Sequence, residues 1–264
     1  GFSLTTNGTL LDEGMAAFLD EHRFSLIISL DGPSRLHDSA RPLANGEGSH
    51  ALALAGIRAV AKHPALAART TLRSTFSSMP ACLPERLEYL NQLADECGLG
   101  NVSVEPADAS EGCAASARGG RNAVFPEELL AEYWAAADWW MGRMRSGGKP
   151  RFHHFAVRLR RLARREAHAS ECGAGCGYVA VNPAGQVFAC HREGDTAIGS
   201  ATGGIDLELQ AAWRDNRIYA RSLCNSCWLR HACGGGCRQS SLAHGLGMHE
   251  PEPFGCRLVE ACFK

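Results

Sequence analysis

CNSCWLRHACGGGC, residues 224–237, places four cysteines in one short segment with the spacing C-x2-C-x5-C-x3-C. Two thiols separated by two residues can bind the same metal, because the turn between them directs both sulfurs to one side. The three glycines before Cys237 let the backbone adopt positive φ angles and pass close to a large ligand. The segment therefore predicts a cysteine-ligated site that organises this part of the fold.

The twelve cysteines are distributed unevenly along the 264 residues. A secreted disulfide scaffold is usually short and rich in cysteine throughout. Here a cysteine-poor half precedes a cysteine-rich half, which favours metal ligation in a reducing compartment, and we expect a cytoplasmic protein. The cysteine-rich half contains Cys172, Cys176, Cys190, Cys224, Cys227, Cys233, Cys237, Cys256 and Cys262.

A predicted β-hairpin connects the first cysteines of this half. GYVAVNPAGQVFAC, residues 177–190, has apolar residues on both sides of a Pro-Ala-Gly turn. Such a hairpin folds Cys190 back toward Cys172 and Cys176. Three thiolates would then share one pocket, and a tetrahedral site needs a fourth ligand.

The cysteine spacing leaves two kinds of metal site open. Zinc ribbons use paired C-x2-C segments, whereas this sequence has one such pair and irregular spacings of three, five and thirteen residues. Ligation by thiolates alone also suits iron–sulfur clusters. We therefore favour two clusters over two zinc sites, and zinc remains the alternative.

Strand and helix signals alternate in the first half of the chain. This order predicts an α/β fold with parallel strands and right-handed crossovers. Four strands are too few to close a barrel, so we expect an arc or an open sheet, with 24–30 buried on both faces. Asp12 and Ser49 are expected N-caps, Pro84 is expected to begin a helix, and residues 31–48 are expected to form a polar loop. The strands are predicted at 2–7, 24–30, 70–76 and 101–106, and the helices at 11–22, 49–62 and 84–97.

Residues 107–123 predict a loop, and a long helix is expected from Pro126. Its aromatic residues Tyr133, Trp134 and Trp140 are interpreted as core packing. Residues 155–166 predict a basic amphipathic helix with a solvated face.

The charge balance excludes two classes of partner. The net charge is −1, with 27 basic and 28 acidic residues, which favours neither nucleic acid nor an anionic membrane. No apolar run is long enough to span a bilayer. The N-terminus, GFSLTTNG, has no initiator Met and no signal-peptide layout, and we expect a fragment of a longer chain.

The full pattern of the second half is Cys172-x12-Gly185-x4-Cys190, then Cys224-x2-Cys227-x5-Cys233-x3-Cys237, then Cys256. This pattern resembles the SPASM domain of radical S-adenosylmethionine (SAM) enzymes. TTNGTLL, ISLDGP, HDSARPLANGEGSH and RSTFS resemble the third to fifth strand segments, with their loops, of the radical SAM partial barrel. The resemblance implies an incomplete partial (β/α) barrel at 1–124, connecting helices at 125–167 and a small SPASM domain with a β-hairpin and helices at 168–264.

The resemblance also implies two auxiliary 4Fe–4S clusters. By position, Cys172, Cys176, Cys190 and Cys237 would bind the first cluster, and Cys237 would cross over from the second knot to do so. Cys82, Cys97, Cys113 and Cys262 have no role in the pattern. The second cluster would be bound by Cys224, Cys227, Cys233 and Cys256.

The S-adenosylmethionine site is expected where barrel strands end. Asn7, Ser29, Asp31 and Arg73 are the candidate cofactor-binding residues, although Asn7 and Asp31 could instead cap turns. Arg73 and Ser74 are adjacent, so only one of them can point inward. The CxxxCxxC motif of the radical cluster does not occur in the chain. The cofactor and a third 4Fe–4S cluster are therefore expected in an intact parent, and this chain alone is expected to be inactive.

The resemblance implies hydrogen abstraction from a peptide or protein by a 5′-deoxyadenosyl radical, with electrons from a reductant such as flavodoxin or ferredoxin. His191 stands where sulfatase maturases usually have Asp, and it could act as a base or donate a hydrogen bond to a cluster sulfur. The segment FACHRE favours thioether or other crosslink formation in a ribosomally made peptide. Formylglycine formation and a non-catalytic electron-transfer or peptide-binding module remain alternatives.

Overall fold

The computed structural model describes residues 1–77, 79–107, 127–192 and 195–263. The chain forms two compact units, of which the first comprises 1–107 and 126–157 and the second comprises 108–125 and 158–264. Within the described ranges, no helix is both long and apolar enough to cross a membrane. The predicted loop at 107–123 and Pro126 lie almost entirely outside the described residues.

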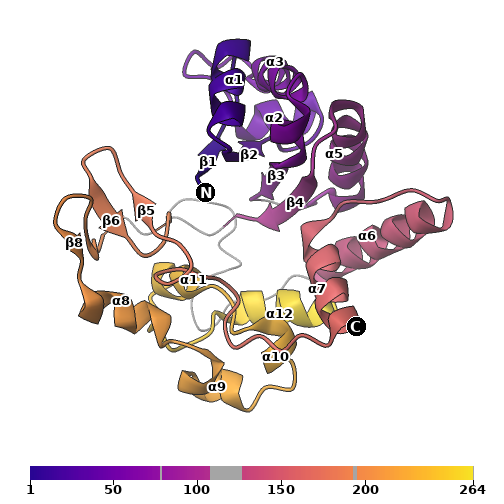
Figure 1. The fold of residues 1–264 in the computed structure, drawn as a ribbon. Helices are drawn as coiled ribbons and strands as arrows, with labels where there is room; N and C mark the ends of the chain where they lie inside the picture. Colours follow the sequence, from indigo (N-terminus) through magenta and orange to yellow (C-terminus); the bar gives the residue numbers. More distant parts are fainter. Residues whose placement is uncertain (78, 108–126, 193–194, 264) are drawn as a thin grey trace. The chain divides into compact units, whose positions relative to one another are not determined.

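The first unit is built on a parallel sheet with the order β1-β2-β3-β4, as the alternation of elements predicted (Figure 1). Helices follow the first three strands, which confirms the α/β class. The strands are β1 (Ser3–Thr6), β2 (Ser25–Ser29), β3 (Thr70–Phe76) and β4 (Asn101–Pro106). The long helices between them are α1 (Glu13–Glu21), α3 (His50–Ala61) and α5 (Leu83–Cys97).

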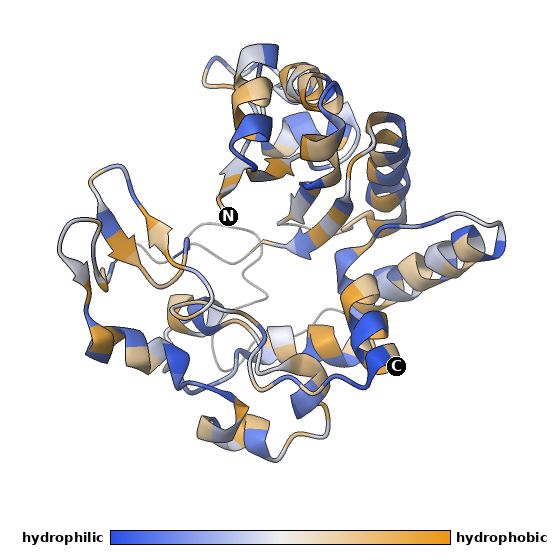
Figure 2. Cartoon of the chain, viewed as in Figure 1, coloured by the Kyte–Doolittle hydropathy of each residue, from blue (hydrophilic) through white to orange (hydrophobic). Residues whose placement is uncertain are grey.

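The sheet has one fully buried face. Leu26, Ile28 and Leu72 are buried there, and Figure 2 shows the matching alternation of hydrophilic and hydrophobic residues along β4. Ile27, which points to the other face, is only half-buried. The prediction that 24–30 is buried on both faces is therefore wrong, because only the face that carries Leu26 and Ile28 is sealed.

Asp12 caps α1 as expected, because its carboxylate accepts a hydrogen bond of 2.7 Å from the Met15 amide. Ser49 occupies the N-cap of α3 but makes no side-chain cap; its hydroxyl donates to the Arg41 carbonyl at 2.6 Å. The segment expected to be a polar loop contains α2 (Ser34–Ala40). A further short helix, α4 (Pro64–Ala68), precedes β3, and α5 begins one residue before Pro84.

Two helices complete the first unit and lead into the second: α6 (Glu127–Arg145) and α7 (His153–Arg164). Tyr133 is buried and its ring lies 6.2 Å from that of Phe152, and Trp140 is also buried. Trp134 is 54% exposed, so the prediction of core packing is wrong for this member of the aromatic stripe. It points away because it follows Tyr133 directly on the helix.

The second unit contains the predicted hairpin, in which β5 (Ala180–Val181) pairs antiparallel with β6 (Gln186–Phe188). Two strands that the sequence did not predict, β7 (Gly199–Ser200) and β8 (Gly204–Ile205), extend this sheet. The regular elements that follow this sheet are short helices (Figure 1). These are α8 (Leu207–Arg214), a 3-10 turn (Ile218–Ala220), α9 (Ser222–Asn225), α10 (Arg230–Cys233), α11 (Arg238–Ala243) and α12 (Pro253–Ala261).

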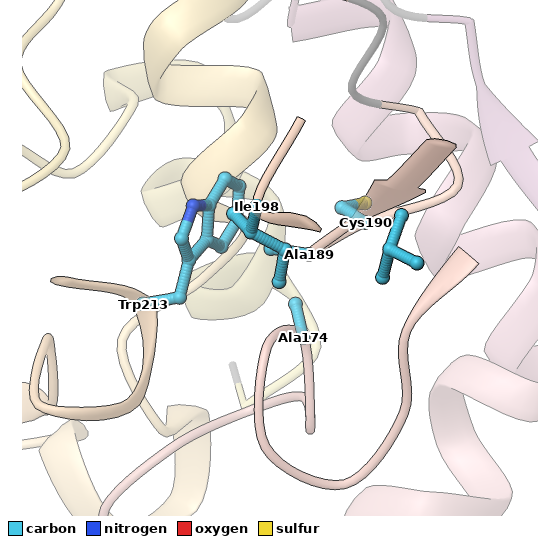
Figure 3. Packing of buried hydrophobic residues seen from close by; sticks show 6 residues of the cluster. Ala174, Ala189, Cys190, Ile198 and Trp213 are labelled. Atoms are coloured by element: carbon cyan, nitrogen blue, oxygen red, sulfur yellow. The ribbon is translucent and has the colours of Figure 1, made fainter. Parts of the chain in front are cut away.

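A small hydrophobic cluster joins the antiparallel sheet to α8 (Figure 3). Gly175 lies against it with φ +76°, and a Cβ at this position would be only 2.5 Å from the Cβ of Trp213. A larger residue would push Trp213 away, so the glycine permits the packing that holds Cys190 in place. The buried members are Ala174, Val187, Ala189, Cys190, Ile198 and Trp213.

Candidate metal centres

Four predicted ligands of the second unit line a single cavity of about 370 Å³. Cys224 lies on α9, Cys233 ends α10 and Cys256 lies on α12. Cys227 follows a tight turn in which its amide donates to the Cys224 carbonyl at 3.1 Å. We name this set, Cys224, Cys227, Cys233 and Cys256, the α9–α12 thiol group.

Apolar side chains form much of the wall of this cavity, including Leu229 and Val259. Burial raises the pKa of the Cys224 and Cys233 thiols. Cys256 opens toward the cavity, yet burial and the neighbouring thiols raise its pKa to about 12. Metal ligands must be deprotonated thiolates, so binding at this group would release protons.

A second group of three predicted ligands gathers beside the hairpin. Cys172 is close enough to Cys190 and Cys237 that both influence its pKa, which burial raises. We name these three residues the hairpin thiol group. Cys176, the fourth predicted ligand, is exposed. The structure therefore groups three of the four predicted ligands and leaves Cys176 at the surface.

Hydrogen-bond donors surround the hairpin thiol group. The Tyr178 hydroxyl donates to Cys190 Sγ at 3.8 Å, and the Ser240 amide donates to Cys237 Sγ at 3.4 Å. Two guanidinium groups add charged donors: Arg192 Nη1 lies 3.5 Å from Cys237 Sγ, and Arg238 Nη1 lies 3.9 Å from Cys172 Sγ. Donors of this kind stabilise negative charge on sulfur.

The triple glycine explains why Cys237 joins the hairpin thiol group. Gly234, Gly235 and Gly236 all have positive φ angles, of +75°, +95° and +70°. Gly234 directly follows α10, and its carbonyl accepts a hydrogen bond of 2.8 Å from the Glu171 amide. The glycines thus carry the chain past the segment that precedes Cys172, so that Cys237 approaches Cys172 and Cys190. Cys237 also lines a second, small cavity together with Cys233 and Cys256.

The donor set fits a thiolate-ligated cluster. A cavity of about 370 Å³ is far larger than one metal ion, and the predicted ligands supply sulfur alone. Among the described residues, no group of three or more Cys, His, Asp or Glu side chains is already arranged to hold a metal ion. None of the described cysteines is in a disulfide.

Two of the candidate cofactor residues, Ser29 and Arg73, lie on the partly exposed face of the parallel sheet. Ser29 pairs in register with Arg73, and Arg73 pairs with Ser103. Arg73 points to this face and forms an ion pair with Glu105, with 3.0 Å between Arg73 Nη2 and Glu105 Oε2. The adjacent Ser74 is buried. Burial would raise the pKa of Glu105, but the positive charges of His154 and Arg73 lower it to about 2.

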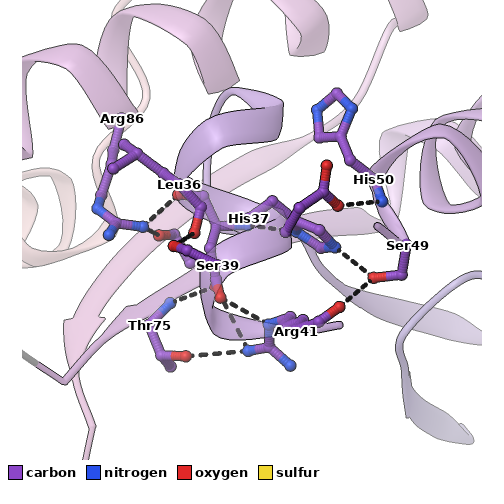
Figure 4. Close-up of polar contacts among 11 residues, drawn as sticks. Leu36, His37, Ser39, Arg41, Ser49, His50, Thr75 and Arg86 are labelled. Carbon is purple, nitrogen blue, oxygen red and sulfur yellow. Dashed lines mark hydrogen bonds and ion pairs between the residues drawn. The ribbon is translucent and has the colours of Figure 1, made fainter. Parts of the chain in front are cut away.

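Asp31 and Asn7 already have partners within the first unit. The Asp31 carboxylate is 1% exposed, accepts from Arg41 Nε at 2.7 Å and accepts from the Thr75 amide at 2.8 Å (Figure 4). The Asn7 side chain accepts from the Thr9 amide at 3.1 Å. These contacts favour the turn-capping alternative for both residues.

Figure 4 also shows that His37 is part of this network. His37 Nε2 lies 3.0 Å from Ser49 Oγ, and its Nδ1 accepts from the Asp31 amide at 3.1 Å. Burial lowers the pKa of His37, so the ring is neutral when it accepts this bond. His191, the catalytic candidate of the second unit, is exposed, and its ring lies 6.4 Å from that of Tyr178.

Known proteins are similar to this chain in sequence. A serine-type anaerobic sulfatase-maturating enzyme of Klebsiella aerogenes is 25% identical over 257 residues, which cover 89% of this chain and 57% of the enzyme. A cysteine-type enzyme of Clostridium perfringens is 51% identical over 39 residues, 15% of this chain and 10% of the enzyme. No protein-family model matches the chain.

Solved structures show the same fold. The structure of native anSMEcpe with bound AdoMet has a TM-score of 0.73 at 18% identity, over 99% of this chain and 71% of that one. The same protein with AdoMet and the Kp18Cys peptide gives 0.71 at 17% identity, over 99% and 72%. SuiB of Streptococcus suis, bound to S-adenosylmethionine, gives 0.51 at 16% identity, over 95% and 57%.

The chain is homologous to the anaerobic sulfatase-maturating enzymes. These enzymes are radical SAM proteins with a SPASM domain, so the expected relationship is confirmed. The chain spans 57% of the length of the Klebsiella aerogenes enzyme.

The sequence did not predict several residues that surround the thiols of this chain. Folding brings Tyr178 to Cys190, Arg192 to Cys237 and Arg238 to Cys172, and no motif spacing marks these contacts. Arg221 likewise approaches Cys224, Cys233 and Cys256. Arg192 lies two residues after Cys190, and Arg238 directly follows Cys237. This closeness to predicted ligands was the available signal.

Proposed function

We propose that this chain is part of a radical SAM enzyme that modifies a peptide or protein, and that it holds two auxiliary 4Fe–4S clusters. The observation that carries the proposal is the sorting of the cysteines into the α9–α12 thiol group and the hairpin thiol group. Homology over 89% of the chain supports the same assignment. When bound, such clusters supply one-electron transfer or a ligation site for a substrate group.

The residues of the chain would hold and shield these groups. In this proposal the apolar cavity wall around Cys224 keeps water away from the bound group, while Tyr178 and Arg238 stabilise the charge on their sulfurs. Ser29 and Arg73 lie on the partly exposed sheet face and are the proposed contacts to S-adenosylmethionine, with Asn7 and Asp31 holding the turns beside them. The sequence contains no CxxxCxxC motif, so the radical-generating cluster would need ligands from outside this chain.

The proposed substrate is a peptide, because a solved structural neighbour contains the Kp18Cys peptide. We favour thioether or other crosslink formation, with exposed His191 beside Tyr178 as the proton acceptor. Formylglycine formation is the second candidate, and the homology to sulfatase-maturating enzymes supports it. Electrons would come from a reductant such as flavodoxin or ferredoxin in a reducing compartment such as the cytoplasm.

Anaerobic reconstitution of the chain with iron and sulfide tests the cluster assignment. Two Cys-ligated 4Fe–4S clusters predict about eight irons and eight sulfides per chain, with visible absorbance. Cys224→Ala should lose about half of the iron, and Cys97→Ala, outside both thiol groups, should lose none. Two bound zinc ions without visible absorbance would refute the proposal.

A full-length protein that contains this chain separates the two reactions. It should be incubated anaerobically with S-adenosylmethionine, a reductant and two peptides: one sulfatase-type peptide and one cysteine-containing peptide of ribosomal origin. Mass spectrometry distinguishes a loss of two hydrogens with a new crosslink from conversion of Ser or Cys to formylglycine. His191→Ala should abolish the favoured reaction without lowering the iron content.

A further inference from the structure

Among the described residues, three arginines are almost fully removed from water, but their electrostatic surroundings differ. Arg86 in the first unit is 6% exposed, and the carboxylates of Asp31, Glu85 and Glu132 favour its charged form. In the second unit, Arg221 is 1% exposed and Arg238 is 4% exposed. Within the part of the chain that the structure describes, neither forms an ion pair with a carboxylate.

Arg221 is held by neutral acceptors. Its Nη1 donates to the Gly235 carbonyl, and its Nη2 donates to the Met248 and Glu250 carbonyls at 3.0 and 3.2 Å. Its Nε is buried and has no hydrogen-bond partner. The side chain is therefore fixed in place, while no Asp or Glu of the described ranges forms an ion pair with it.

Arg238 is held in the same way beside the other thiol group. Its Nε donates to the Asn216 carbonyl at 3.0 Å, and its Nη2 donates to Ser170 Oγ at 2.7 Å. The remaining nitrogen, Nη1, lies 3.9 Å from Cys172 Sγ. One guanidinium thus reaches a predicted cluster ligand directly.

The electrostatics of Arg221 identify where its counter-charge would be. Burial lowers the pKa of Arg221, and the positive charge of Arg238 lowers it further. The groups that act in the opposite direction are Cys224, Cys256 and Cys233, three members of the α9–α12 thiol group. A buried charge is costly unless an opposite charge accompanies it, and Gly235, whose carbonyl accepts from Arg221, lines the cavity of these thiols.

We infer that Arg221 and Arg238 are built-in counter-ions for anionic groups ligated by the two sets of cysteines, Arg221 for the α9–α12 thiol group and Arg238 for the hairpin thiol group. This inference rests on the proposed function. Four thiolates outweigh the positive charge of a 4Fe–4S core, so the ligated cluster is an anion. The cations then make reduction easier, since reduction adds negative charge. They also make the stability of the second unit depend on whether the clusters are bound.

Reduction potentials test the first consequence. The reconstituted chain and its Arg221→Met, Arg221→Lys, Arg238→Met and Arg238→Lys variants are titrated and followed by electron paramagnetic resonance. At a fixed potential, each Met variant should lower the reduced-to-oxidised ratio of one cluster about tenfold, a shift of ~59 mV. The Lys variants should restore most of the loss, because they keep the charge. Arg217→Met, at an exposed arginine, is the matched control.

Thermal unfolding of loaded and metal-free chains tests the second consequence. The loaded chain should be stabilised less in Arg221→Met and Arg238→Met than in the wild type, because the metal-free variants no longer bury an unbalanced cation. A purely structural role would lower both melting temperatures equally and leave their difference unchanged, and that result overturns the inference. If Arg221→Met does not fold, Arg238→Met carries the same comparison.

The two proposals fail in distinguishable ways. A wild-type chain that binds no iron and sulfide refutes the proposed function. A chain that binds both, with potentials and loading-dependent stability unchanged in the Met variants, refutes the counter-ion role alone.

Discussion

Gly234 packs so closely against Glu171 that a Cβ on Gly234 would lie 2.6 Å from the Glu171 backbone nitrogen. The contact is made by backbone atoms on both sides, so no side chain can move aside to relieve it. It fixes the triple glycine against the segment that leads to Cys172, and Cys237 follows from there into the hairpin thiol group.

Gly234→Ala should therefore destabilise the second unit and impair the hairpin thiol group. The left-handed φ alone costs about 1–2 kcal/mol, and the backbone clash adds to it. Gly245→Ala is the control, because Gly245 has φ +68° but no atom within 4 Å. Urea unfolding should show a larger loss for Gly234→Ala, with iron lost mainly from one cluster. Equal losses in the two variants would mean that the contact with Glu171 does not matter.

The periodic part of the fold was predictable from sequence. β3 and β4 have the predicted bounds, because strongly alternating residues in a strand leave little freedom in register. The short helix α2 was missed because its sequence, SRLHDSA, has no apolar periodicity. Its stability comes from tertiary contacts, such as the hydrogen bonds of His37 to Ser49 and to the Asp31 amide.

The candidate site was predictable only in part, for a similar reason. Cysteine spacing indicated the ligands, since spacing limits which thiols a tight turn can bring together. It could not show that Cys176 lies at the surface or that Arg221 approaches the α9–α12 thiol group. Those positions depend on loops whose paths are set by packing around Trp213 and by the triple glycine.

Asp31→Asn should destabilise the first unit. The buried carboxylate is lost as a partner for Arg41, whose side chain is 31% exposed, so the cost should fall below the 3–5 kcal/mol of a fully buried pair, at about 2 kcal/mol. Glu13→Gln, which breaks the exposed pair with Lys62, should change the stability far less. Chemical denaturation measures both. A neutral Asp31→Asn would instead support a role in cofactor binding over one in holding the turn.

Acid should weaken the first unit through His37. Burial is the main cause that lowers its pKa in the folded state from the ordinary 6.5, so the unfolded chain binds the proton more readily. The stability is fully present above pH 6.5 and is lost as the pH falls through the lower folded pKa. His37→Gln should flatten the free energy of unfolding over this window, whereas His22→Gln, at an exposed histidine, should leave the slope unchanged. An unaltered slope in His37→Gln would exclude His37 as its source.

Cys190 and Cys176 should differ as ligands of the first cluster. Cys190 is buried in the hydrophobic cluster with Trp213 and accepts a hydrogen bond from Tyr178, so it is fixed beside Cys172. Cys176 is exposed and must move to complete the ligand set. Cys190→Ala should therefore lose about four irons per chain, whereas Cys176→Ala should retain a weakened cluster that releases iron faster to a chelator. Iron analysis before and after chelator treatment measures this. Rapid and complete loss in Cys176→Ala would show that Cys176 binds as firmly as Cys190.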